Sequence, residues 1–62
     1  MTLLRRIEVY LRTSGTPATR FGREAVGDPR FVFDLRMGRE PRWQTERRVN
    51  AFLDRRATGA AR

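Results

Sequence analysis

Apolar residues recur at helical spacing in four stretches of the chain, and no stretch alternates as a half-buried strand would. The first stretch predicts a helix over residues 2–13, apolar on one side and mostly charged on the other. Thr2 suits the N-cap, and Ser14 followed by Gly15 is a typical stop. The apolar stripe contains Leu4, Ile7, Tyr10 and Leu11, with Leu3 beside it.

A second helix is expected to follow almost at once. Thr16 is its predicted N-cap, and Pro17 suits the first helical position, where the missing N–H costs nothing. Gly27 is the candidate for the left-handed residue that ends the helix after residue 26. The inner stripe consists of Phe21 and Ala25, helped by Val26.

The third helix is expected over about residues 29–37. Asp28 is its predicted N-cap, and Pro29 again fits the first turn. Gly38 is the natural stop, and Pro41 prevents easy continuation. The residues predicted to face inward are Val32 and Leu35, with Phe31 alongside.

A fourth helix is expected over about residues 42–56, with Val49, Phe52 and Leu53 facing inward. Trp43, near its start, is interpreted as a lid on the core, with stacking on nucleic-acid bases as the alternative. The four helices predict an all-α fold, a compact four-helix bundle. We expect one domain over residues 1–57 and a flexible tail over residues 58–62.

Composition adds positive charge and removes most catalytic chemistry. The chain has fourteen Arg, no Lys and seven acids, for a net charge of +7. Such a charge attracts polyanions, whether nucleic acid, an anionic membrane or an acidic protein. Cys and His are absent, so the usual zinc ligands and the commonest general base are missing. We expect no enzymatic activity, no metal and no cofactor.

Nothing in the sequence predicts insertion into a membrane. No segment approaches the roughly 20 apolar residues that span a bilayer. The N-terminus lacks the apolar stretch of a signal peptide. A membrane-surface helix over residues 2–13 is disfavoured, because Glu8 interrupts its basic face and the core needs its apolar stripe. We expect a cytoplasmic protein.

The second and third helices are predicted to meet directly, over residues 26–28. So short a connection forces a steep crossing, which requires a small residue where the two backbones approach. Gly22 fits this position, in mid-helix where Gly otherwise costs about 1 kcal/mol against Ala. In such a pair the second helix can enter a DNA major groove while the first crosses the phosphate backbone.

A longer pattern extends over about residues 16–53. It has a small residue in the first helix of the pair, aliphatic residues three apart in the second, a closing Gly, a following Pro and a further apolar helix. Its members are Phe21, Gly22, Ala25, Val32, Leu35, Gly38, Pro41, Thr45, Val49, Phe52 and Leu53. This pattern resembles the phage repressor and Cro-like helix-turn-helix family, also called xenobiotic response element regulators.

The resemblance implies a lambda-repressor-like fold with a central helix-turn-helix, and a sequence-specific, double-stranded DNA-binding transcriptional regulator. Its third helix, about residues 29–37, would lie in the major groove. The implied base-reading residues are Arg30, Phe33, Asp34 and Met37.

Each of three base-reading candidates has a plainer interpretation. Arg30 is placed to donate two hydrogen bonds to guanine, or is a solvated surface residue. Phe33 is expected to cover a thymine methyl group or to wedge against a sugar, or else to close the core under the fourth helix. Asp34 accepts from cytosine, or pairs with a neighbouring Arg.

Phosphate contacts are expected in two places, with an ordinary solvated basic rim as the alternative. The start of the second helix presents free N–H groups, which attract anions. The end of the third helix and the loop after it carry Arg at every third position, where the resembled family contacts the DNA backbone. The candidates are Thr16, Thr19 and Arg20, then Arg36, Arg39 and Arg42.

The partners implied are double-stranded DNA, a second copy of the chain, and the transcription machinery, so we expect a nucleoid-associated protein. A homodimer would use the first helix, the fourth helix or the tail. The alternative function is a small basic protein-interaction module, an antirepressor or an adaptor for the transcription machinery, without sequence-specific DNA binding.

Overall fold

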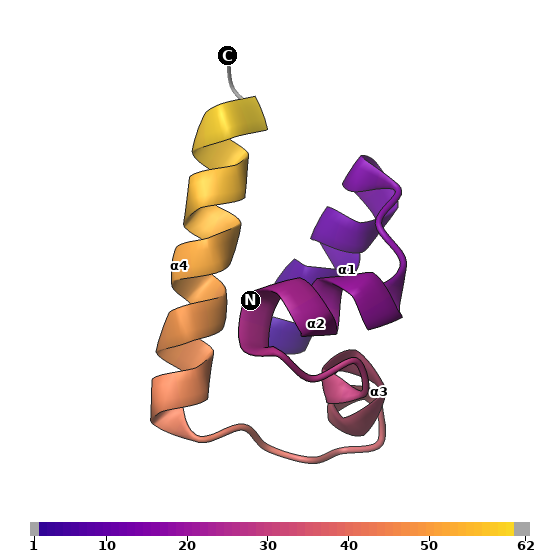
Figure 1. The fold of residues 1–62 in the computed structure, drawn as a ribbon. Coiled ribbons are helices and arrows are strands. Elements are labelled where there is room, and N and C mark those ends of the chain that lie inside the picture. The colour runs from indigo at the N-terminus through magenta and orange to yellow at the C-terminus, as the bar shows by residue number, and fades with distance from the viewer. Residues whose placement is uncertain (1, 61–62) are drawn as a thin grey trace.

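The computed structural model describes residues 2–60, and the side chains of residues 2–56. In this part of the chain there are four helices and no strand (Figure 1). They are α1 (Leu3–Ser14), α2 (Ala18–Val26), α3 (Phe31–Arg36) and α4 (Trp43–Ala60). The expected all-α class with four helices is confirmed. The predicted tail overlaps the end of α4, and its residues 61–62 lie outside the described residues.

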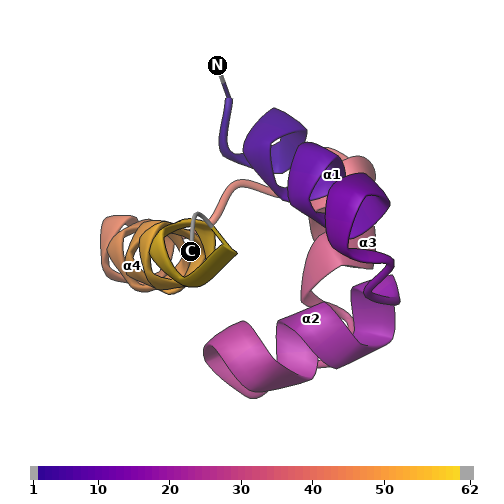
Figure 2. The same ribbon diagram turned by 90° about the horizontal axis from the view of Figure 1, so that it is seen from above.

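The helices form two groups. The long helix α4 stands to one side, and α1, α2 and α3 cluster on the other (Figures 1 and 2). Both α1 and α2 pack against α3 and against α4. The loop from α3 to α4 runs along one end of the molecule and brings the chain across (Figure 1).

The caps of α1 agree with the sequence prediction. The hydroxyl of Thr2 accepts a hydrogen bond of 3.2 Å from the backbone N–H of Arg5. Gly15 is left-handed, with φ of 72°, and its N–H donates to the carbonyl of Leu11. Gly27 ends α2 in the same way, with φ of 74°. These positive φ values explain why glycine stands at the C-terminal ends of both α1 and α2.

The predicted N-cap of α2 is wrong. Pro17, not Thr16, is the capping residue, with extended backbone angles and no side-chain cap. The carbonyl of Pro17 accepts the first helical hydrogen bond, from the N–H of Phe21 at 3.0 Å. The Thr16 hydroxyl instead accepts a 2.8 Å hydrogen bond from the hydroxyl of Ser14. Thr16 therefore belongs to the turn between the helices.

The third helix is shorter than predicted, because residues 27–30 form a connection of their own. The Asp28 carboxylate accepts a hydrogen bond of 2.9 Å from the N–H of Arg30. The Asp28 carbonyl accepts another, of 3.1 Å, from the N–H of Phe31. The predicted N-cap of this helix is therefore wrong: Arg30 is the N-cap, without a side-chain cap, and Asp28 instead stabilises the turn that precedes α3. Helical hydrogen bonding still reaches from the carbonyl of Arg30 to the N–H of Met37.

Gly22 lies where α2 and this connection touch, as predicted. A Cβ at this position would overlap the backbone carbonyl oxygen of Asp28 and press on the Cβ of Phe31. The carbonyl of Gly22 also accepts a 3.1 Å hydrogen bond from the N–H of Asp28. The absence of a side chain is therefore what allows α3 to pack against α2.

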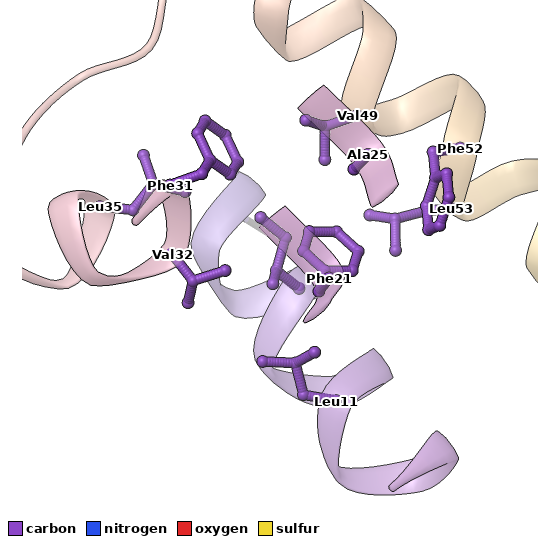
Figure 3. Packing of buried hydrophobic residues seen from close by; sticks show 10 residues of the cluster. Leu11, Phe21, Ala25, Phe31, Val32, Leu35, Val49, Phe52 and Leu53 are labelled. Carbon is purple, nitrogen blue, oxygen red and sulfur yellow. The ribbon is translucent and has the colours of Figure 1, made fainter. Parts of the chain in front are cut away.

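The core is built from all four predicted stripes (Figure 3). Phe21 is fully buried, and its ring lies 5.6 Å from that of Tyr10 and 5.4 Å from that of Phe52, centroid to centroid. Leu3, Leu4, Tyr10 and Val26 are only partly buried. The buried residues are Ile7, Leu11, Phe21, Ala25, Phe31, Val32, Leu35, Val49, Phe52 and Leu53.

Trp43 is not a lid on the core, so that interpretation is wrong. Its side chain is 63% exposed. At 3.6 residues per turn, Trp43 lies about a third of a turn around α4 from the buried Val49. The guanidinium of Arg47 lies over its ring instead, 5.8 Å from the centroid.

Candidate nucleic-acid interface

The outer side of α3 carries the residues of functional interest. Its inner side is fixed by Phe31, Val32 and Leu35, which are all buried. Arg30, Phe33 and Met37 lie on the opposite side, because positions three and four apart share a helix face. We call these three side chains the outer ridge. The core contacts of α3 therefore present the ridge to solvent.

Phe33 does not close the core under α4, so that interpretation is wrong. The residue is 41% exposed. It follows the buried Val32 by one position, which turns it about 100° around the helix, away from the core. Its ring lies 5.7 Å from the guanidinium carbon of Arg36. Met37 is even more accessible, at 86%.

One flank of the ridge is tied to α1 by an ion pair. Arg36 donates to both carboxylate oxygens of Glu8, at 2.8 Å from Nε and 2.8 Å from Nη2. These hydrogen bonds lower the pKa of Glu8 and raise that of Arg36. Arg36, a predicted phosphate contact, therefore has its guanidinium fork occupied.

The other flank is tied to the loop after α3. Nη1 of Arg39 lies 3.5 Å from Oδ2 of Asp34, and the N–H of Arg39 donates to the Asp34 carbonyl at 3.1 Å. Of the two interpretations of Asp34, pairing with a neighbouring Arg is the one observed. Asp34, four residues after Arg30 and three before Met37, lies on the same side of α3 as the ridge, with its carboxylate engaged by Arg39.

The remaining phosphate candidates differ in how free they are. Arg20 donates to Glu24 along α2, from Nε to Oε2 at 3.0 Å. Thr19 and Arg42 are exposed, and within the described residues Arg42 has no ion pair. Thr16 is engaged with Ser14. The candidate set thus contains one unpaired cation, Arg42.

Sequence reasoning missed the contacts that join distant helices. Arg6 of α1 donates to Asn50 of α4 at 2.7 Å and also pairs with Asp54. Glu8 is the only acid in α1, which was a signal that it has a partner. Finding that partner needs the fold, because Arg36 is 28 residues away.

Several further Arg side chains carry charge without an ion pair in the described part of the chain. They are Arg5, Arg12, Arg23, Arg30, Arg47, Arg48 and Arg55. Only Arg30 among these belongs to the ridge.

A hollow of about 430 Å³ lies beside the Asp34 flank. It is bounded by the end of α2, by α3, and by the loop into α4, and the Asp34–Arg39 pair lies on its wall. The described residues include no group of three His, Cys, Asp or Glu side chains arranged to hold a metal. No helix among those residues is long and apolar enough to span a membrane.

The fold and the ridge define a small, basic, four-helix protein with an accessible third helix. No family model, curated protein or solved structure matches this chain.

Proposed function

We propose that this protein is a sequence-specific, double-stranded DNA-binding regulator of the helix-turn-helix type. In this proposal α3 enters the major groove and α2 lies across the phosphate backbone. The observation that carries the proposal is the outer ridge. Arg30, Phe33 and Met37 all face solvent from a helix whose opposite side is locked in the core.

The dimensions of α3 suit this role. A helix has a diameter of about 10–12 Å with its side chains, and the major groove is about 12 Å wide. The seven steps from Arg30 to Met37 cover about 10 Å at 1.5 Å per residue. Base pairs stack about 3.4 Å apart, so the ridge extends over about three base-pair steps.

Arg30 is the specificity-determining residue of this proposal. It is exposed and has no ion pair within the described residues, so its guanidinium is available. Guanine offers two acceptors, O6 and N7, that match the fork of Arg. The expected contact is therefore with a guanine at one end of this stretch of base pairs.

Phosphate contacts are assigned by how readily each side chain can leave its partner. Arg42 forms no ion pair within the described residues, and Thr19 is exposed, so neither side chain has to leave a charged partner. Arg20 and Arg39 are in exposed ion pairs, which are worth only about 0–1 kcal/mol, so phosphate can replace the carboxylate. Arg36 is least available, because its two hydrogen bonds to Glu8 hold α3 on α1.

The proposal also bears on assembly. A homodimer formed through α1 or α4 would present two copies of α3 to the same duplex. Two-fold docking on one side of DNA then places the half-sites about one helical turn, roughly 34 Å, apart. The symmetry and spacing of the bound sequences report this directly.

The decisive experiment is a selection of bound duplexes from a random library at physiological salt. We expect enrichment of a short motif, with a guanine at a fixed position. Binding of the enriched duplex is then compared with that of a scrambled duplex of equal length. Equal binding of the two duplexes would mean that the protein binds polyanions without sequence specificity, which contradicts the proposal. Binding to neither duplex would overturn the proposal altogether.

A second candidate function is a basic protein-interaction module. It is favoured by Trp43, which is 63% exposed, because Trp is enriched among residues that dominate binding at protein interfaces. This function predicts that Trp43→Ala abolishes binding to a protein of the transcription machinery and that no duplex is enriched. The DNA-binding proposal predicts instead that a duplex is enriched.

A further inference from the structure

Two of the three ridge side chains are apolar, which is unusual for a surface that binds a polyanion. Phe33 and Met37 are four residues apart and are 41% and 86% exposed. They leave apolar surface in water, at a cost of about 25 cal/mol per Å². Neither residue contributes to the core cluster, so their exposure requires another explanation.

The charged residues next to this apolar pair are engaged in ion pairs in the unbound protein. Arg36 on one side is held by Glu8, and Asp34 on the other pairs with Arg39. In the unbound protein the apolar part of the ridge is therefore a strip one side chain wide, bordered by these two ion pairs. A strip this narrow fits within the major groove, which is about 12 Å wide.

The major groove contains one methyl group on the edges of the four bases, the C5-methyl of thymine. Besides small C–H edges, such as C5–H of cytosine, the groups there are hydrogen-bond donors or acceptors. Covering those with Phe or Met would leave them unpaired, at about 1–3 kcal/mol each. The apolar strip therefore favours positions that carry a C5-methyl group.

On the proposed function, we infer that Phe33 and Met37 recognise the C5-methyl groups of pyrimidines in the major groove. Phe33 lies about 4.5 Å along the helix from Arg30, and Met37 about 6 Å further, at 1.5 Å per residue. At 3.4 Å per base pair, the methyl groups lie about one and three steps from the guanine that Arg30 contacts. Thymine and 5-methylcytosine both carry this group.

Replacement of thymine by deoxyuridine tests the inference, because it removes only the methyl group. Each thymine of the selected duplex is replaced in turn, and the dissociation constant is measured by fluorescence anisotropy. At the positions that face the ridge we expect about fourfold weaker binding, as for exposure of one methylene-sized group. At thymines elsewhere in the duplex we expect no change.

The variants Met37→Ala and Phe33→Ala assign the effect to the ridge. Each variant should bind the thymine and deoxyuridine duplexes equally when the replaced base is the one that its missing side chain would contact. The helical circular dichroism of each variant should match that of the unmodified protein. Val9→Ala is the control, because Val9 is 42% exposed on α1 and outside the ridge. It should keep the full thymine preference.

A second pair of duplexes identifies the source of the methyl group. Cytosine and 5-methylcytosine are compared at the same position. Tighter binding to 5-methylcytosine means that the methyl group alone is recognised, and equal binding means that the recognised methyl belongs to thymine. If the selected duplex binds but tolerates deoxyuridine everywhere, the inference is wrong and the proposed function stands. If no duplex is selected, both are wrong.

Discussion

Arg30 is the only charged side chain of the outer ridge, and it has no competing carboxylate among the described residues. Replacing it should therefore affect specificity more than general affinity. For Arg30→Ala we expect the selected duplex to lose about 1–3 kcal/mol of its advantage over a scrambled one. Competition binding with the two duplexes measures this difference.

Two other Arg replacements separate charge from specificity. Arg42→Ala, on the loop beside α3, should weaken both duplexes alike, because a phosphate contact is independent of sequence. Arg55→Ala removes the same charge from the last turns of α4 and should change neither preference nor affinity appreciably. Identical behaviour of Arg30→Ala and Arg42→Ala would contradict the roles assigned to them.

Two phenylalanines offer a matched test of core against ridge. Phe21 is fully buried between the rings of Tyr10 and Phe52. Its replacement by Ala should cost about 3–5 kcal/mol, which equals the roughly 3–5 kcal/mol that a domain of this size has available. Phe21→Ala should therefore have a free energy of unfolding near zero, so that about half of the molecules are unfolded at 25 °C by circular dichroism. Phe33→Ala should unfold in urea at nearly the midpoint of the unmodified protein.

At the scale of elements, the contact between α2 and the connection to α3 depends on one missing side chain. In an exposed helix, Gly to Ala stabilises by about 1 kcal/mol. For Gly22→Ala we expect the opposite sign, because the new Cβ would overlap the carbonyl oxygen of Asp28, a backbone atom. Overpacking of this kind costs about 1–3 kcal/mol.

Urea unfolding of Gly22→Ala measures the sign directly. Arg23→Ala, one position along α2, is the control, since Arg23 is exposed and without an ion pair in the described part of the chain. It should leave stability unchanged or slightly raised. A stabilised Gly22→Ala variant would show that α2 and α3 do not approach as closely as described.

The ion pair between α1 and α3 makes stability depend on pH. The hydrogen bonds from Arg36 lower the pKa of Glu8 in the folded protein. The folded state thus favours the ionised form, so this stabilisation is complete above the ordinary glutamate pKa of about 4.3. It is lost as the pH falls through the lower folded value. Both side chains are partly exposed, so we expect about 0.2–1 kcal/mol.

Glu8→Gln removes this contribution. In urea unfolding at pH 7 the variant should be less stable than the unmodified protein, and the difference should shrink towards pH 3. Glu40→Gln is the control, because Glu40 is exposed and without an ion pair within the described residues. A difference that stays constant with pH would mean that ionisation of Glu8 is not its origin.

The helices were predictable because their ends depend on local chemistry. Gly15 and Gly27 stop α1 and α2 in the left-handed conformation, and the apolar spacing of each helix selected the buried face. Thr16 was misassigned because a local competitor, the Ser14 hydroxyl, engages it. A propensity for N-caps does not reveal which nearby group captures a hydroxyl.

The candidate site was less predictable, because its flanks depend on contacts between helices. The chain shows Arg36 only as one of fourteen basic residues. Its pairing with Glu8 appears once α1 and α3 are placed side by side. The exposure of Phe33 and Trp43 likewise depends on angular position and on what each helix packs against.

At the scale of the whole molecule, the proposed function combined with the net charge of +7 predicts an affinity for DNA that depends on salt. Each phosphate neutralised should contribute a slope of about −0.9 to the logarithm of the binding constant against the logarithm of salt concentration. We expect a steep negative slope, lowered in magnitude by about 1 in Arg42→Ala. Titrations between low and physiological salt measure it, and a flat response would argue against phosphate contacts.

The placement of the ridge outside the core cluster has a consequence for protein design. Positions 30, 33 and 37 point away from the residues that hold the four helices together, so a broad choice of side chains there is compatible with folding. A combinatorial library diversified at these three codons should yield mostly folded members. If α3 reads bases, its members would prefer different operators, and this 62-residue chain would become a small scaffold for reprogrammed DNA recognition.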